Sequence, residues 1–405
     1  MDFNELISTS IFFLKNALFL FVPLVLFWLL FNIWLDYVRT KFASSQQYTL
    51  LRVYPPKEVL KTPAAMELFI NALYQTGGEA TPIDVYLKGK SRPIFSLEIA
   101  STGGDVGFYV WTLSAFRKYI ENQIYAQYPG IEVVEVPDYA RQIDYETGNY
   151  GMFGFEYGLT QADPVPIKTY VDYGLDQTML EDDQKTDPIT STLEFLGQLG
   201  PGENAWIQII LKAHKKEDKK DGTFFGKTDY WVDQAKEEIK KIRKDSVIEN
   251  EEGVKIQVQT TSQREKIDAI ERNISKLGFD VGIRAIYISE KDSFVGVNIP
   301  GLLGSFKQFG SSSLNGFRPV ITTSFKYWWQ DPFGKRSESL KRQVFNDYQN
   351  RVYFGTVIGT EVRKKMVLNT EELATIFHFP GKVAITPGLT RVKSRKSEAP
   401  TNLPI

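Results

Sequence analysis

The sequence predicts an α+β protein: one N-terminal transmembrane helix followed by two ferredoxin-like α/β sandwich units, the second with a charged helical insertion. Three observations lead to this fold class. Residues 16–35 contain no charged side chain in 20 positions. Two later stretches, 82–136 and 188–289, each combine strand and helix patterns in an order typical of a ferredoxin-like sandwich. A charge-dense segment, residues 212–261, interrupts the second stretch.

The uncharged run at 16–35 is predicted to be a membrane anchor. A helix rises about 1.5 Å per residue, so this run reaches about 30 Å, the thickness of a bilayer's hydrocarbon core. Trp28, Trp34 and Tyr37 gather near its C-terminal end, where aromatic side chains favour the membrane interface. A secretory signal peptide is the alternative, but the run is long, its start is acidic and no small-residue cleavage site follows.

The charges that flank this run predict its orientation. Arg39 and Lys41 follow it, whereas Asp2, Glu5 and a single Lys15 precede it. Positive flanks stay in the cytoplasm, so we expect a single-pass protein of the cell membrane with its N-terminus outside and its bulk cytoplasmic. The complete absence of cysteine fits a reducing compartment.

The composition excludes several classes of function. With 48 basic and 49 acidic residues, the chain has no overall field that would attract nucleic acid. With two histidines and no cysteine, zinc and iron–sulfur sites are not expected. Aromatic residues make up 14% of the chain, which favours packed cores over disorder.

The first part of the chain divides into an anchor, a linker and one α+β unit. We assign residues 1–41 to the tail and anchor, 42–62 to an extended linker, and 63–187 to the first unit. Within that unit, the apolar spacing predicts helices and strands. The helices are expected at 63–75 and 113–127, and the strands at 82–88, 93–100, 106–111, 131–136 and 166–175.

The second unit, residues 188–368, opens with Asp187-Pro188, a favourable helix start. Strands are expected at 205–211 and 279–289, with a helix between them after Ser262–Glu265, whose spacing is that of a capping box. Residues 230–245 are expected to form a solvated helix inside the insertion 212–261. Residues 300–335 are interpreted as a loop or flap, and 339–354 as a helix. Residues 369–405 form a C-terminal helix and an extended basic tail.

No residue of the chain is predicted to be catalytic or to bind a cofactor or metal. The segment 222–228 (GTFFGKT) resembles a phosphate-binding loop, but only three residues separate its glycines and no apolar strand precedes it. It is interpreted as a surface turn. His378, within FHFP, is interpreted as a core or capping residue. The chain is therefore not expected to be an enzyme.

Two basic segments leave contact with nucleic acid open. Residues 212–244 hold eleven basic and seven acidic residues, a mixture that favours a solvated helix over a DNA-binding patch. The tail residues Arg391, Lys393, Arg395 and Lys396 are a candidate contact for anionic lipid or nucleic acid, and an extended linker is the favoured interpretation.

Several strings together resemble a known family. They are SLEIASTGGDVGFYVW, ENQIYAQYPGIEVVEV, DPITSTLEFLGQLGPGENAWIQIIL, GFDVGIRAIYISEKDSF and LNTEELATIFHFPG, followed by the closing APTNLPI. They resemble the poorly characterised N-terminal region that precedes HerA/FtsK-like ATPases related to conjugation and type IV secretion in candidate-phyla bacteria. In such relatives a segment like EELATIFHFP lies shortly before the ATPase domain, and this chain contains no ATPase motif.

The resemblance implies a membrane-anchored, non-catalytic component of a translocation assembly that docks a separate cytoplasmic HerA/FtsK-like ATPase. Its docking residues are expected in the C-terminal helix and the segment after it. They are Glu372, Leu373, Phe377, His378, Phe379 and Pro380. The alternative is a membrane-bound scaffold that assembles into a homo-oligomer without a motor.

Overall fold

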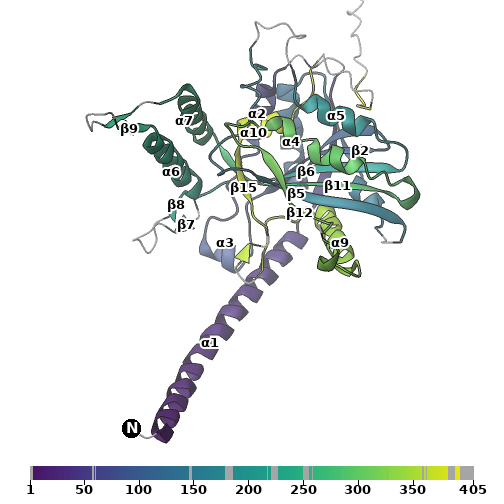
Figure 1. Cartoon of the computed structure of the whole chain (residues 1–405). Helices are drawn as coiled ribbons and strands as arrows, with labels where there is room; N and C mark the ends of the chain where they lie inside the picture. The colour runs from purple at the N-terminus through teal and green to yellow at the C-terminus, as the bar shows by residue number, and fades with distance from the viewer. Residues whose placement is uncertain are drawn as a thin grey trace, which may run out of the picture. The chain divides into compact units, whose positions relative to one another are not determined.

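A computed structural model describes residues 3–56, 59, 61–145, 148–177, 186–216, 218–219, 227–249, 255–257, 259–325, 327–357, 360–361, 363–381 and 388–392 (Figure 1). The chain forms two compact units. The smaller unit comprises Met1–Gln47, Gly77–Arg92 and Phe354–Lys364, and the larger comprises Tyr48–Thr76, Pro93–Tyr353 and Lys365–Ile405.

The smaller unit is built on one long helix, α1 (Phe3–Ser44), which contains the whole predicted span. Its other elements are α3 (Pro82–Tyr86) and the short pair β13 (Thr356–Val357) and β14 (Thr360–Glu361). The strand predicted at 82–88 is wrong, because the hydroxyl of Thr81 accepts a hydrogen bond from the Asp84 amide at 3.1 Å and Pro82 occupies the first helical position. This start signal favours a helix over the alternating pattern of the segment.

The larger unit contains a nine-stranded sheet in which neighbouring strands are antiparallel. Its order is β12-β5-β11-β6-β2-β3-β1-β4, and β15 pairs with β11 beside this path. The strands are β1 (Tyr48–Tyr54), β2 (Ile94–Thr102), β3 (Asp105–Leu113), β4 (Glu132–Val136), β5 (Tyr150–Leu159), β6 (Glu203–Ala213), β11 (Gly278–Glu290), β12 (Phe317–Thr322) and β15 (Met366–Asn369). The prediction of a mixed α/β protein with one N-terminal apolar helix is confirmed.

Eight of the nine strands form two quartets with the same connectivity. The first runs β1, α2 (Pro63–Ala72), β2, β3, α4 (Arg117–Gln127) and β4, and its spatial order is β2-β3-β1-β4. The second runs β5, α5 (Ile189–Gly197), β6, β11, α8 (Asn298–Gly304) and β12, and its order, β12-β5-β11-β6, is the first in reverse. The quartets meet where β2 pairs with β6, with Leu97 opposite Ile209. One continuous sheet therefore joins both halves of the chain.

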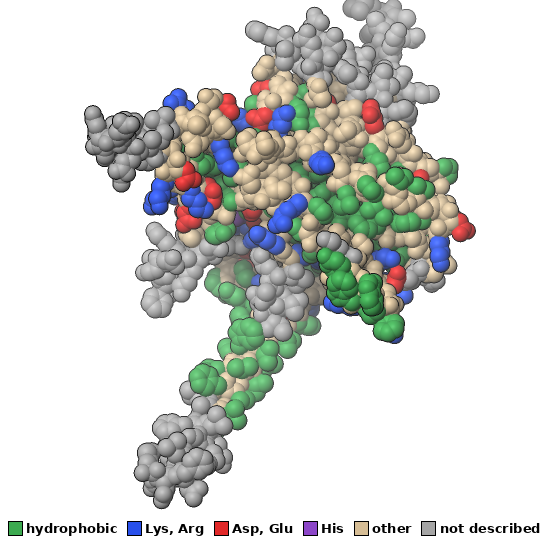
Figure 2. Space-filling view, in the orientation of Figure 1, with side chains coloured by type: hydrophobic (Ala, Val, Ile, Leu, Met, Phe, Trp, Pro, Cys, Tyr) green, Lys and Arg blue, Asp and Glu red, His purple; other side chains and the backbone are tan. Residues whose placement is uncertain are grey.

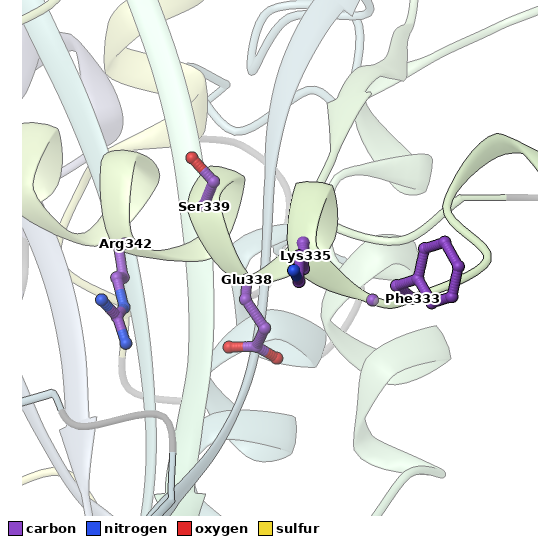
Figure 3. Close-up of a pocket in the computed structure, with 6 residues that line it drawn as sticks. Phe333, Lys335, Glu338, Ser339 and Arg342 are labelled. Atoms are coloured by element: carbon purple, nitrogen blue, oxygen red, sulfur yellow. The ribbon is translucent and has the colours of Figure 1, made fainter.

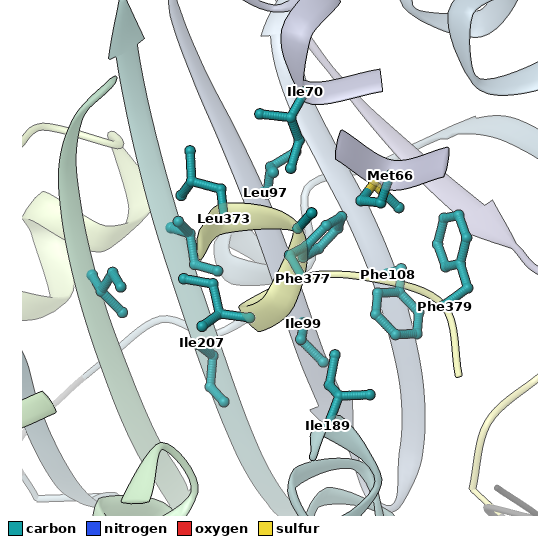
Figure 4. Close-up of a cluster of buried hydrophobic side chains, with 14 of the residues drawn as sticks. Met66, Ile70, Leu97, Ile99, Phe108, Ile189, Ile207, Leu373, Phe377 and Phe379 are labelled. Carbon is teal, nitrogen blue, oxygen red and sulfur yellow. The ribbon is translucent and has the colours of Figure 1, made fainter. Parts of the chain in front are cut away.

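Helices from both quartets cover one face of the sheet. Alternate strand residues such as Leu51, Val110 and Ile207 point into this layer and pack against α2, α4, α5 and α10 (Thr370–Ile376). Figure 4 shows Leu373 and Phe377 of α10 among side chains of α2, β2 and β6. The main core lies between these helices and the sheet.

A single long helix covers part of the opposite face. The intervening strand residues Leu50, Tyr109 and Trp206 point to this side and pack against α9 (Lys335–Gln349) and the short helix η2 (Tyr139–Gln142). The rings of Trp206 and Tyr348 lie 5.5 Å apart. The face opposite the helical layer is thus buried where α9 crosses it.

The charged insertion between β6 and β11 forms a separate arm within the larger unit (Figure 1). It contains α6 (Tyr230–Asp245) and α7 (Thr261–Ile274), which share a small core with Val165 of the segment after β5. The short strands β7 (Asp218–Lys219), β8 (Lys227–Thr228), β9 (Val247–Glu249) and β10 (Lys255–Gln257) accompany them. The helix predicted at 230–245 is confirmed.

Several predicted elements need correction. The linker at 42–62 contains β1, because its alternating residues complete the sheet between β3 and β4. The strand at 166–175 is a series of turns held by backbone bonds such as Tyr173 N–H to Thr169 O. The loop at 300–335 contains most of α8 and all of β12, whose Pro319 stands at a register shift on the sheet edge. The capping box of α7 is Thr260 with Gln263 instead of the predicted Ser262 with Glu265.

Candidate functional site

The N-terminal helix of the smaller unit is apolar around its circumference. Phe19, Phe27 and Leu30 of α1 are 65–83% exposed, and Figure 2 shows hydrophobic side chains along its described length. A helix of a soluble protein normally buries one apolar stripe in a core. The segment Phe21–Ser44 is long and apolar enough to cross a membrane, and a signal sequence has the same features.

The residues predicted at the membrane interface lie in the C-terminal half of α1. The indole N–H of Trp34 donates to the carbonyl oxygen of Tyr86 in α3 at 2.8 Å. The Tyr37 ring lies 6.1 Å from that of Trp34, and the Lys41 ammonium lies 5.9 Å from the Tyr37 ring. Trp28 is half exposed, and Arg39 is exposed on the last turns of the helix.

A collar formed by α3 is fastened against this part of α1. Gly89 has φ +64°, and a Cβ at this position would lie 2.2 Å from the carbonyl oxygen of Val38, so the two backbones are in direct contact. Ile83 and Leu87 of α3 are more than half exposed, and Lys88 pairs with Asp84 at 3.3 Å. Apolar side chains beside lysines are typical of elements at a membrane surface.

The predicted docking residues are buried in the larger unit. The list is Glu372, Leu373, Phe377, His378, Phe379 and Pro380, and each of them is inaccessible or nearly so. The Phe108 ring of β3 packs edge-on against the rings of both Phe377 and Phe379, at 5.5 and 5.1 Å. A docking surface needs exposed side chains, so the structure removes this segment as a contact for a partner.

His378 is a buried structural residue. Its Nδ1 lies 2.9 Å from the carbonyl oxygen of Ala374, and its Nε2 lies 3.0 Å from the carboxylate of Asp187. Burial would lower the pKa of His378, but the Asp187 carboxylate raises it above its ordinary value. The interpretation of His378 as a core or capping residue is confirmed.

The acidic start of α10 serves the fold. Glu372 accepts hydrogen bonds from the amides of Asn369 at 2.9 Å and Ile167 at 3.0 Å, and burial raises its pKa to about 8. Its neighbour Glu371 pairs with Lys276 at 2.8 Å. These contacts tie α10 to the turn at 166–172 and to the end of α7.

A buried ionic cluster fixes the C-terminal end of α9 to the sheet. Glu98 of β2 accepts from the Nε and Nη2 groups of Arg351, each at 3.1 Å, and from the Tyr139 hydroxyl at 2.8 Å. Ser96 and Gln208 donate to the same carboxylate at 2.7 and 3.0 Å. Burial would raise the pKa of Glu98, but the Arg351 guanidinium holds it below its ordinary value. All five hydrogen bonds of the Glu98 carboxylate are made within the protein, so the cluster has a structural role, and we call it the lock.

A second ionic cluster holds the insertion to the sheet. His214, just after β6, has its Nδ1 2.6 Å from a carboxylate oxygen of Asp280 and its Nε2 3.2 Å from Asp229. Asp229 in turn accepts from the Val232 amide at the start of α6. Among the described residues, no group of three or more His, Cys, Asp or Glu has the geometry of a metal site.

The start of α9 carries an open depression of about 590 Å³. Its lining residues are Phe333, Gly334, Lys335, Glu338, Ser339 and Arg342. Figure 3 shows Lys335, Glu338 and Arg342 along one side of the helix and Phe333 beyond its first turn. All of the lining comes from one segment, so the depression is a surface with mixed charges and an exposed aromatic ring.

Two predicted features fall largely outside the described residues. Of the basic tail, Lys393, Arg395 and Lys396 lie outside them. Arg391 is half-buried in a short segment that bridges to β3, and burial lowers its pKa. Residues 222–226 of the glycine-containing segment also lie outside the described part of the chain.

Comparison with known families identifies the one to which the chain is similar. The sequence profile of a family described as a domain of unknown function (DUF8128) matches residues 38–390. The match begins within α1 and extends over the whole described sheet. No curated protein matches the chain.

Proposed function

The chain belongs to the DUF8128 family, and we propose that it is a membrane-anchored, non-catalytic component of a translocation assembly related to conjugation or type IV secretion. In this assembly it docks a cytoplasmic HerA/FtsK-like ATPase. The observation that carries the membrane part is the exposed apolar circumference of α1. The motor partner rests on the resemblance of the five sequence strings described above.

The collar beside α1 supports a retained anchor. A cleaved signal sequence has no need of a folded partner, whereas Trp34 and Val38 of α1 contact Tyr86 and Gly89 from a distant part of the sequence. The flanking charges, Arg39 and Lys41 after the apolar run, favour a cytoplasmic body.

The two quartets of the sheet support the interpretation of the body as two ferredoxin-like units. A ferredoxin-like unit is a β-α-β-β-α-β split repeat. The first quartet has this element order, and the second has it with the α6–α7 arm inserted between β6 and β11. We propose a degenerate tandem repeat joined through β2 and β6.

The non-catalytic role is supported by the way in which the charged clusters are used. Glu98, Glu372 and His378 have strongly perturbed environments, which often mark active sites. Each is instead saturated with hydrogen bonds from the protein's own backbone and side chains.

With α10 buried, we propose the outer side of α6 as the contact for the ATPase. Lys236, Lys240 and Lys244 recur every four residues on α6 and are exposed. The opposite side of α6 packs on α7 through Ala235 and Ile239. Figure 1 shows this arm standing beside the sheet, where a large partner has access.

Capture of the partner tests the proposal. The full chain is co-expressed with the HerA/FtsK-like ATPase encoded nearest to its own gene and is purified in detergent through a tag. We expect the ATPase to co-purify and charge reversal of Lys236, Lys240 and Lys244 to abolish its capture. Charge reversal of Lys118, exposed on α4, is the matched control. An ATPase that ignores the wild-type chain contradicts the proposed role.

The alternative is a membrane-bound scaffold that assembles with itself. Neither edge of the sheet favours pairing between copies. Pro319 and a register shift interrupt β12, and β4 is five residues long with Glu132 and Glu135 exposed. A large homo-oligomer formed by the chain alone in detergent would favour the scaffold.

A further inference from the structure

The segment between β12 and α9 exposes a cluster of aromatic side chains on the larger unit. Trp328 is 79% exposed, Trp329 60% and Phe333 84%. Figure 2 shows hydrophobic side chains gathered at the surface over the α9 region, with Lys and Arg side chains beside them. Contiguous exposed apolar surface of this kind marks a site of interaction.

Hydrogen bonds hold this aromatic loop, residues 327–333, in one shape. The Tyr327 amide donates to the side-chain oxygen of Gln330 at 3.2 Å, and the rings of Tyr327 and Trp329 stack at 4.4 Å. Asp331 accepts from the amides of Arg336 and Ser337 at 3.1 and 2.7 Å, which joins the loop to the first turn of α9. The exposed rings are thus displayed on a built support.

The start of α9 combines two exposed cations with the acidic side chains of Asp331 and Glu338. Lys335 and Arg336 occupy its first two positions, although the positive end of the helix dipole favours acidic residues. The Arg336 guanidinium donates to the carbonyl oxygen of Gln330 at 2.9 Å, so the cation is held beside the loop. Asp331 and Glu338 supply the negative charge that this helix end favours, and the exposed Lys335 and Arg336 remain open to an anionic partner.

The far end of α9 is fixed as firmly as its start. Val344 and Phe345 pack on the sheet, and Arg351 is locked to Glu98. The aromatic loop therefore moves with the sheet. Its rings are already exposed, so they can insert into a non-aqueous surrounding without unfolding of the loop.

We propose that the aromatic loop inserts into the interfacial layer of an anionic bilayer, with Trp328, Trp329 and Phe333 among the upper acyl chains and Lys335 and Arg336 against the headgroups. The inference rests on the proposed membrane anchor. Only residues 45–47 separate α1 from β1, and three residues span at most about 10 Å. The chain therefore enters the sheet within four residues of the end of the anchoring helix.

The chemistry of the loop fits lipid better than a protein partner. Tryptophan beside lysine and arginine is the composition of membrane-interface belts. The adjoining depression is open and comes from one segment, whereas a peptide partner is usually seated in a groove or along a sheet edge.

The experiment uses the full chain, whose lack of cysteine allows a single label. Phe333→Cys carries a nitroxide, and the protein is reconstituted in vesicles of equal parts phosphatidylcholine and phosphatidylglycerol. Flotation first verifies that the chain is in the membrane. Accessibility of the nitroxide to oxygen, which concentrates in lipid, is then compared with accessibility to a water-soluble nickel chelate. Leu68→Cys is the matched control, because Leu68 is 55% exposed on α2 in the opposite layer.

We expect the label at 333 to be accessible to oxygen and protected from nickel, and the label at 68 to show the reverse. Replacing Lys335 and Arg336 by glutamine is expected to weaken immersion about 30-fold on anionic vesicles, and Trp328→Ser with Trp329→Ser to abolish it.

Four results would overturn the inference. In the first, the chain floats with the vesicles but the label at 333 is accessible to the nickel chelate, which contradicts insertion of the loop and not the membrane anchor. In the second, the label at 333 is protected from both reagents, which indicates a protein contact. In the third, the label at 68 is the immersed one. A chain that does not float contradicts the anchor, and with it the inference. Capture of the ATPase is a separate measurement that tests the motor role alone.

Discussion

Replacement of Arg351 by methionine tests whether the buried cluster at the end of α9 is the lock that the geometry indicates. Methionine keeps most of the side-chain volume and removes the guanidinium. Glu98 then loses its two charged hydrogen bonds and keeps neutral donors from Ser96, Tyr139 and Gln208. Breaking a buried ion pair from one side costs about 3–5 kcal/mol.

The structure gives a second route to this magnitude. Without Arg351, burial raises the pKa of Glu98, and the carboxylate takes up a proton in the folded protein. The ordinary pKa of the group is 4.5, and each unit of pH above it costs about 1.4 kcal/mol. Holding Glu98 protonated at pH 7 therefore costs about 3.4 kcal/mol. The lost bonds to Asp138 add to this, which agrees with the general range.

The pH dependence separates this mechanism from a simple packing defect. In the wild type the folded pKa of Glu98 is lowered, so its contribution is present above pH 4.5 and is lost as the pH falls further. In the variant the folded pKa is raised, so the protein loses stability as the pH rises through 4.5. The difference in free energy of unfolding between the two proteins is expected to grow by about 3 kcal/mol from pH 4.5 to pH 7.

Urea unfolding in detergent, followed by tryptophan fluorescence, measures this difference. Trp111 reports locally, since the Arg351 guanidinium lies 5.6 Å from its ring. Glu98→Gln combined with Arg351→Met is expected to recover most of the loss and to remove its pH dependence. Arg117→Met, which breaks an exposed pair, is the control and should leave the midpoint unchanged. A loss of stability that does not depend on pH, or a double variant no more stable than Arg351→Met, would show that Glu98 and Arg351 do not form a stabilising ion pair.

Three further predictions concern single positions. Gly282→Ala places a Cβ 2.4 Å from the Tyr353 ring and should lower the free energy of unfolding in urea by about 1–3 kcal/mol. An unchanged midpoint of urea unfolding would mean that the ring moves freely. The raised pKa of Glu372 in the folded protein, about 8, means that the wild type loses stability as the pH rises from 4.5 to 8. Glu372→Gln should remove this pH-dependent loss. A pH profile of stability identical to that of the wild type would contradict a protonated Glu372. Gly89→Ala should release α3 from α1, because its Cβ would meet Val38, and this is read as faster amide exchange at 82–89 with the sheet unaffected. Unchanged exchange there would show that the collar tolerates the added carbon.

Local signals in the sequence predicted most of the helices. The helix starts predicted at Pro63, Asp187-Pro188 and residue 369 lie within two residues of the observed starts of α2, α5 and α10. These signals work because a helix end is satisfied by residues within one turn of it. The same logic explains the miss at 82–88, where the short-range cap of Thr81 outweighs a strand-like alternation.

The contacts of the candidate site were harder to predict because they join residues that are far apart in the sequence. Ser96 and Glu98 alternate with apolar residues in β2, a pattern that indicates a solvent-facing side. The structure buries both, because α9 and Arg351, about 250 positions later in the chain, cover that face. Likewise, the apolar residues of Phe377–Phe379 were predicted as a docking surface, and α10 instead fills the space between α2 and the sheet.

Hydrophobic length, periodicity and charge density are properties of contiguous residues, so the sequence predicts the apolar N-terminal helix, the mixed α/β class and the position of the charged insertion. Tertiary structure alone decided that β1 and β5 complete two quartets of one sheet, that α10 is core, and that the rings at 328–333 stand exposed beside two cations. Each of these depends on which distant segment covers a given face, and free energy of burial is gained only after the chain has brought those segments together.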